Sequence, residues 1–218
     1  MKSRDLEILN DLQRFRCLTR DDLIHLHFSH LKNPINSANT VLKRLRRDGY
    51  IDVNTSHNPY LYFASPAPIK KDSTKIPHFL KIVDFYKQVC AYEGPKSFII
   101  EPKYGKGYME PDIFMIFKRA PFFVEIQRSV YSQKVMNEKI KRYETYYMGQ
   151  EWQKEPWQPK DRKVFPRILM VSDTRYNIDS PYIKVFQIQN IDDFIEQVTP
   201  RIPADETIRI NQGNIRLK

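Results

Sequence analysis

A segment without periodic apolar residues divides the chain in two. Residues 65–77 read SPAPIKKDSTKIP and contain three prolines. Proline fixes φ and removes an amide donor, so such a stretch neither continues a helix nor enters the interior of a sheet. The sequence therefore predicts a first domain over residues 1–65, a linker over 66–77 and a second domain over 78–218. We expect a fragment that ends near Ala67 to fold alone.

The composition is that of a globular protein with an anionic partner. The chain has 218 residues, of which 41% are hydrophobic, and it has no apolar run that approaches the roughly 20 residues needed to span a bilayer. Cys17 and Cys90 lie far apart and lack metal-ligand spacing, so we expect reduced thiols, a cytoplasmic location and no membrane association. The net charge of +10 suits double-stranded DNA, because cations that neutralise phosphates release counterions.

Three short helices followed by a hairpin are predicted in the first domain. Apolar spacing predicts helices over residues 3–15 and 19–28, with Ser3 and Thr19 as N-caps. A third helix is expected from a cap at Asn36 or Ser37 to Asp48-Gly49, and strands over 50–53 and 60–63 flank the turn 54–59. This order predicts a winged helix-turn-helix.

The third helix carries the candidate DNA contacts. Ala38, Val41, Leu42 and Leu45 form its buried stripe, whereas hydrogen-bonding side chains come early and cations late on its other faces, as in a reader of the major groove. The candidate DNA-binding residues are Asn36, Ser37, Asn39, Thr40, Lys43, Arg44 and Arg47. The alternative is a solvated basic face without a partner. Charge reversal at Lys43, Arg44 and Arg47 should weaken DNA binding if the first interpretation is right.

The second domain alternates helices and strands. The expected elements are a helix over 78–92, strands over 96–101, 111–117 and 122–127, a helix over 132–147, strands over 167–171 and 182–187, and a helix from Asn190 to about 198. The core order is therefore α-β-β-β-α-β, with a hairpin expected over 207–218. The whole chain is predicted to be α+β.

Two carboxylates fall on neighbouring strands of this expected core. Asp112 lies on the second strand and Glu125 on the third, and the connection between the strands is short. Together with the carbonyl of Ile126 they form an all-oxygen set that suits Mg²⁺ or Mn²⁺, and no other cofactor is expected. Such an ion would polarise a phosphodiester and activate water. The alternative is a structural role, with Glu125 paired to Arg128 or Lys139.

This arrangement resembles the PD-(D/E)xK nuclease core, which places Asp and then Glu-x-Lys on these two strands. Gln127 stands at the lysine position and supplies no charge to the reacting phosphate. Lys139 or Lys141 on the following helix is the candidate substitute. The resemblance implies a catalytic group made of Asp112, Glu125, Gln127 and Lys139, with Asp112 and Glu125 holding the metal.

The sequence also resembles the replication-relaxation family of plasmid, phage and mobile-element proteins, over about residues 5–147. Its members look like a winged helix followed by Pro-Asp, then Glu-x-Asp on a strand, then Lys-x-x-x-Tyr on a helix. The matching residues are Pro111-Asp112, Glu125-Ile126-Gln127 and Lys139-Ile140-Lys141-Arg142-Tyr143. Gln127 replaces the second acidic residue of the family pattern. The resemblance implies a role in replication or DNA relaxation of an extrachromosomal element.

Three functions follow from these expectations. The favoured one is a DNA-binding replication protein with a degenerate nuclease-like domain that has little or no activity. The alternatives are a metal-dependent DNA endonuclease that uses Asp112 and Glu125, and a transcriptional regulator with a C-terminal dimerisation domain. The expected partner is double-stranded DNA, and the sequence leaves open a homodimer and contacts with replication proteins.

Overall fold

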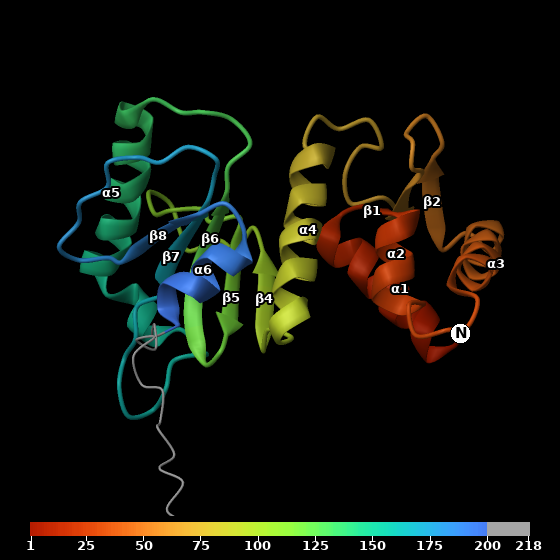
Figure 1. Cartoon of the computed structure of the whole chain (residues 1–218), viewed down its shortest axis with the longest axis horizontal. Helices are drawn as coiled ribbons and strands as arrows, with labels where there is room; N and C mark the ends of the chain where they lie inside the picture. Colours follow the sequence, from red (N-terminus) through yellow and green to blue (C-terminus); the bar gives the residue numbers. More distant parts are fainter. Residues whose placement is uncertain (200–218) are drawn as a thin grey trace, which may run out of the picture.

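The computed structural model describes residues 1–199 of the chain. Helices and strands form two groups that lie side by side, with helix α4 between them (Figure 1). The predicted α+β class is confirmed. The hairpin expected over residues 207–218 lies outside the described residues. Among residues 1–199, no helix is both long and apolar enough to cross a membrane.

The first group contains three helices and three strands. Its elements are α1 (Ser3–Phe15), β1 (Leu18–Thr19), α2 (Arg20–His27), α3 (Pro34–Arg47), β2 (Ile51–Asn54) and β3 (Leu61–Ala64). The strands form an antiparallel sheet in the order β1-β3-β2. The two-residue strand β1 was not predicted, because so short a segment has no periodicity of its own. It pairs Leu18 with Tyr62.

The ends of the helices follow from local side chains. Thr19 caps α2 as expected, since its hydroxyl accepts from the Asp22 N–H while the Asp22 carboxylate accepts from the Thr19 N–H. The cap expected at Ser3 is wrong, because α1 already includes Ser3 and Lys2 occupies the N-cap position. The hydroxyl of Ser3 instead donates to Glu7.

Helix α3 begins earlier than predicted. Pro34 occupies its first turn, where a fixed φ suits the helix and a missing N–H leaves no bond unmade. Asn36 and Ser37 therefore lie inside the helix and do not cap it. At the other end Gly49 adopts a φ of 79° and donates its N–H to the Arg46 carbonyl, which ends α3 where the sequence predicted.

The second group is a five-stranded sheet covered by helices on both faces. Its elements are α4 (Ile76–Tyr92), β4 (Ser97–Ile100), β5 (Ile113–Phe117), β6 (Ala120–Ile126), α5 (Gln133–Gly149), the 3₁₀ helix η1 (Glu151–Lys154), β7 (Arg167–Val171), β8 (Val185–Ile188) and α6 (Ile191–Val198). The strand order is β4-β5-β6-β7-β8, antiparallel up to β6 and parallel from β6 to β8. The predicted order of elements is confirmed. Helix α4 begins two residues before the expected position, which shortens the linker.

Side chains alternate between the two faces of this sheet, as the pleat of a strand requires. Phe122 and Val124 belong to the core on the side of α4 and α6. Phe123 of the same strand packs with Met136 and Tyr143 of α5 on the other side. The sheet is therefore the middle of three layers, and the end of β6 reaches toward both faces.

The two groups share one hydrophobic core. The ring of Phe15 at the end of α1 lies 5.2 Å from Tyr86 of α4 and 6.3 Å from Phe98 of β4, measured between centroids. The guanidinium of Arg14 covers all three rings. Lys87 of α4 adds an ion pair with Asp22 of α2, at 2.6 Å. The relative position of the groups is thus set by packing across α4.

The contacts across α4 bear on the expected separate folding of residues 1–67, because a fragment with these residues lacks them. We expect the fragment to melt cooperatively but at a lower temperature than the full chain, since it exposes Phe15, which is fully buried. Phe15→Ala should cost about 3–5 kcal/mol in the full chain and clearly less in the fragment, which lacks Tyr86 and Phe98. Chemical denaturation of the four proteins measures this difference. An unfolded fragment would show that the two groups form a single folding unit.

Candidate nucleic-acid interface and carboxylate site

The outer face of α3 is polar and exposed. Helix α3 lies at the end of the first group that is farthest from the five-stranded sheet (Figure 1). Its buried side consists of Ala38, Leu42 and Leu45, as predicted, while Val41 is half-buried. The exposed polar side chains are Asn36, Asn39, Thr40, Lys43, Arg46 and Arg47, and Ser37 is half-buried. Ile35 in the first turn is the one exposed apolar side chain of the helix. Among the described residues, the one ion pair of these exposed side chains joins Arg47 to Asp48, just after the helix, at 2.9 Å.

Three of the candidate DNA contacts, Thr40, Arg44 and Arg47, have partners inside the protein. The guanidinium of Arg44 donates to Asp5 of α1 at 2.7 Å, and the Asp5 side chain is buried. Burial alone would raise the pKa of Asp5, but the hydrogen bonds from Arg44 and from the Lys2 N–H outweigh it and hold the pKa below its ordinary value. Thr40 donates its hydroxyl to the Asn36 carbonyl. Arg44 therefore ties α3 to α1, whereas Lys43 extends into solvent.

Glu125 is the centre of the carboxylate site. It lies near the end of β6 with only 1% of its surface exposed. One oxygen, Oε1, accepts from the Tyr143 hydroxyl at 2.6 Å, and the other, Oε2, lies 2.5 Å from the Lys139 ammonium. Lys139 and Tyr143 are four residues apart on α5 and so share one helix face. Of the two partners considered for Glu125, Lys139 makes the ion pair.

Asp112 lies just before β5 and accepts a hydrogen bond from the neighbouring strand β6. Its Oδ2 accepts the Ile126 N–H at 2.7 Å, and its Oδ1 lies 3.1 Å from Nε2 of His78 on α4. His78 was not singled out from the sequence, since it lies on α4, 34 residues before Asp112 in the chain. Asp112 therefore connects the ends of β5 and β6 to α4.

Gln127 lies on the same side of the sheet as Glu125. Its amide nitrogen contacts the sulfur of Met136 on α5 at 4.0 Å, as the alternation along a strand predicts. Its Oε1 is buried and has no hydrogen-bond partner among the described residues. The position next to Glu125 that a nuclease core gives to lysine is thus filled by a neutral amide, and the cation comes from α5.

Burial and mutual contacts raise the pKa values of Glu125, Lys139 and Tyr143. Burial raises the pKa of Glu125 to about 7, although the Lys139 charge and the Tyr143 hydrogen bond act against this rise. Burial by itself lowers the pKa of Lys139, but the charge of Glu125 outweighs it and the pKa is raised. Burial and Glu125 also raise the pKa of Tyr143 well above its ordinary value, so its hydroxyl keeps the proton that it donates.

The carboxylate oxygens of Asp112 and Glu125 are not arranged to coordinate a divalent ion. All four carboxylate oxygens of Asp112 and Glu125 already contact a protein donor. Within residues 1–199, no group of three or more His, Cys, Asp or Glu is arranged to hold a metal. A cation would have to displace Lys139 from a carboxylate that is almost fully buried, and the ammonium already supplies the compensating charge. The residues as arranged therefore do not fit a resident Mg²⁺ or Mn²⁺.

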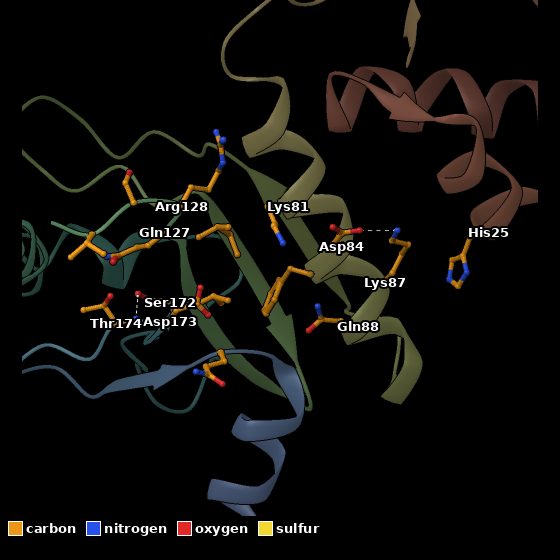
Figure 2. A pocket seen from close by; sticks show the side chains of 16 residues that line it. His25, Lys81, Asp84, Lys87, Gln88, Gln127, Arg128, Ser172, Asp173 and Thr174 are labelled. Atoms are coloured by element: carbon orange, nitrogen blue, oxygen red, sulfur yellow. Dashed lines mark hydrogen bonds and ion pairs between the residues drawn. The ribbon is translucent and has the colours of Figure 1, made fainter. Parts of the chain in front are cut away.

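A separate cleft of about 730 Å³ lies beside this site, where α4 meets the carboxyl ends of β6 and β7. Figure 2 shows Lys81, Asp84 and Lys87 on α4, with Asp84 and Lys87 joined by an ion pair. Ser172, Asp173 and Thr174, which follow β7, face them, and His25 of α2 lies at the far side. The cleft is open, and most of its lining residues are polar, with Phe85, Ile126, Val130 and Val171 as the apolar ones. Gln127 lines it, but Asp112, Glu125 and Lys139 do not.

Comparison with known proteins identifies one family, whose matched range covers both candidate sites. The sequence model of the replication-relaxation family matches residues 9–160, which run from α1 to beyond η1. The chain belongs to the replication-relaxation family. The matched residues of this replication-relaxation protein include α3, Asp112, Glu125 and Lys139, while β7, β8 and α6 lie outside them. No curated protein and no solved structure shows significant similarity to the chain.

Membership suggests a role in the replication or relaxation of plasmid or mobile-element DNA. Two of the residues through which the sequence resembled this family contact Glu125. Lys139 and Tyr143, from the Lys-x-x-x-Tyr segment of the replication-relaxation protein, both contact the Glu of the Glu-x-Asp position. The spacing of four residues on a helix was the sequence signal for this contact.

Proposed function

We propose that this replication-relaxation protein binds double-stranded DNA of a plasmid, phage or other mobile element through α3. In this proposal α1 to β3 form a winged helix, and α4 to α6 form a degenerate PD-(D/E)xK-like domain. The observation that carries the proposal is the polar, cationic and exposed face of α3 at the outer end of the molecule. A second copy of the chain and replication proteins are further partners that it allows.

The geometry of α3 supports contact with a major groove, which is wide enough to admit a helix. Asn36, Asn39 and Lys43 follow each other at spacings of three and four residues, so they lie along one side of the helix. Amide side chains can read base edges, and Lys43 and Arg47 would contact phosphates. The exposed turn between β2 and β3, residues 55–60, would act as the wing beside the groove.

The carboxylate site supports a structural role in preference to hydrolysis. Glu125 is almost fully buried and neutralised by Lys139. Hydrogen bonds from Tyr143 to Glu125 and from Ile126 to Asp112 join α5, β6 and the start of β5. Such a group orients elements of the fold but offers no open face for a hydrated ion or an attacking water. If the domain formed by α4 to α6 does not hydrolyse DNA, its role is to bind DNA or a protein partner.

The second candidate function, a metal-dependent endonuclease, is favoured by one observation. Lys139 was the candidate substitute for the missing lysine, and its ammonium reaches Glu125. In a nuclease this cation would stabilise the charge that develops on the phosphate. For a transcriptional regulator with a ligand, a closed apolar pocket would be expected, whereas the cleft of Figure 2 is open and most of its lining residues are polar.

Incubation with DNA separates binding from cleavage. We expect the purified protein to shift supercoiled and linear DNA with or without Mg²⁺ or Mn²⁺, and to leave both uncut, because the carboxylates are engaged by protein donors. Asp112→Ala should retain DNA binding, since Asp112 contacts α4 and β6 while α3 lies at the outer end of the first group. Gel shift and nicking assays on the same samples measure both properties. Efficient Mg²⁺-dependent cleavage that is lost in Asp112→Ala and Glu125→Ala would establish the nuclease instead.

A further inference from the structure

We propose that the second group of elements binds single-stranded nucleic acid in a basic groove on the face of β4 and β5. The groove has a volume of about 1000 Å³ and lies between these strands and the loop of residues 155–167. It is a second nucleic-acid site beyond the proposed function, because it shares no residue with α3. It also lies at the β5–β6 turn, which is the opposite end of β6 from Glu125.

Five exposed cations line this basic groove. They come from the start of β4, the β5–β6 turn, the loop and the start of β7, and they are Lys96, Arg119, Lys160, Arg162 and Arg167. None of them makes an ion pair within residues 1–199. Glu155 is the one acidic residue of the lining, and it accepts from Tyr146. Unpaired cations of this density attract a phosphate backbone and release its counterions.

Aromatic rings lie among these cations. Trp157 of the loop packs on Phe114 of β5 with ring centroids 5.0 Å apart, and both line the groove. Phe165 lines it as well and is half-buried, and Ile99 of β4 presents an exposed apolar side chain. The indole N–H of Trp157 is buried and has no hydrogen-bond partner among the described residues.

The combination of rings and cations favours a single strand over other anions. Bases stack on aromatic side chains only when their faces are free, and in a duplex those faces are covered by neighbouring base pairs. A single strand can place bases on Trp157 while its phosphates meet Arg119 and Arg162 on the rim. An acidic protein segment would match the charge but would make no use of a stacking surface.

The experiment compares two charge reversals of equal size in the full chain. Arg119→Glu/Arg162→Glu should weaken binding of a labelled oligothymidylate about tenfold or more and leave a duplex of equal length bound as in the wild type. Lys43→Glu/Arg47→Glu on α3 should do the reverse. All four side chains are exposed, so both variants should melt as the wild type does. Fluorescence anisotropy at constant salt gives the affinities of the wild type and of both variants for the two probes.

A second pair of variants tests stacking. Trp157→Ala should lower the affinity for oligothymidylate about tenfold, whereas Trp157→Phe should keep most of it, because a phenyl ring still stacks. An abasic strand of the same length should bind the wild type as weakly as oligothymidylate binds Trp157→Ala. Quenching of tryptophan fluorescence by oligothymidylate should vanish in Trp157→Phe, since Trp152 is buried away from the groove.

Each outcome decides between the two proposals. If the wild type binds the duplex but not oligothymidylate, or if the α3 variant alone loses oligothymidylate, the groove proposal is wrong and the α3 proposal stands. If the groove variant loses oligothymidylate while the α3 variant keeps its duplex affinity, the α3 proposal is wrong and the groove proposal stands. Equal binding of the abasic strand and oligothymidylate would overturn the assignment of Trp157 as a stacking platform.

Discussion

Replacing Lys139 by methionine is expected to destabilise the fold by about 3 kcal/mol at about pH 8, and by much less at about pH 6. The ammonium of Lys139 is 2.5 Å from Glu125, which is 1% exposed. Without the ammonium, a charged Glu125 would be buried and unpaired. At the lower pH the carboxyl can take up a proton and avoid this cost, because burial raises its pKa to about 7.

The sign of this pH dependence follows from proton binding. Burial raises the folded-state pKa of Glu125 to about 7, above the value of 4.5 that is ordinary for a glutamate carboxyl. Between those values the folded state holds a proton that the unfolded state has released, so the stability of the wild type falls as pH rises and levels off above about 7. Loss of Lys139 raises the folded-state pKa further, so the stability of Lys139→Met keeps falling above that point. Urea denaturation at the two pH values measures the difference.

Two variants serve as controls for this prediction. Glu125→Gln/Lys139→Met removes both charges and should recover most of the lost stability, since a neutral pair carries no buried charge. Lys141→Met changes an exposed lysine of the same helix and should stay within about 0.5 kcal/mol of the wild type. A cost for Lys139→Met that is the same at both pH values would mean that Glu125 does not titrate in this range.

The order of helices and strands was predictable because each element carries its own periodicity. The alternation of Phe122, Phe123 and Val124 between two cores is visible in the sequence as a strand, and α5 shows helical spacing from Met136 to Tyr147. The convergence of Glu125 with α5 was partly predictable for the same reason. A strand places Glu125 and Gln127 on one side, and a helix places Lys139 and Tyr143 on one face.

The features that escaped sequence reasoning depend on contacts between distant segments. Arg44 looks like its neighbours on α3, but its partner Asp5 is 39 residues away. His78 meets Asp112 only because α4 packs across the ends of β5 and β6. The cations of the basic groove are spread from residue 96 to residue 167, so no local charge run marks them. Such contacts arise from tertiary packing, which the spacing of apolar residues within one segment does not predict.

Reversal of Lys43 and Arg47 is expected to cause the largest loss of duplex binding. Two cations that are proposed to contact phosphates become anions that would repel them, so the affinity at moderate salt should fall by about a hundredfold or more. Arg44 is left unchanged in this variant, because Arg44→Glu would place a carboxylate against the buried Asp5 and disturb the packing of α1 on α3. A loss of binding can then be assigned to the surface and not to the fold.

Lys134→Glu/Lys141→Glu provides a control with the same change in net charge. Both lysines are exposed on α5, in the other group of elements. This variant should bind duplex DNA within about threefold of the wild type, because charge far from the interface acts only through a screened field. A similar loss in both variants would show that net charge, and not the face of α3, drives binding.

The salt dependence of duplex binding tests the assignment of α3 to DNA most directly. The dissociation constant of a labelled duplex is measured at several salt concentrations for the wild type, the Lys43→Glu/Arg47→Glu variant and the α5 control. We expect the plot of log affinity against log salt to be less steep by about two units for the α3 variant and unchanged for the control. An α3 variant with the affinity and the slope of the wild type would contradict the assignment of α3 to DNA.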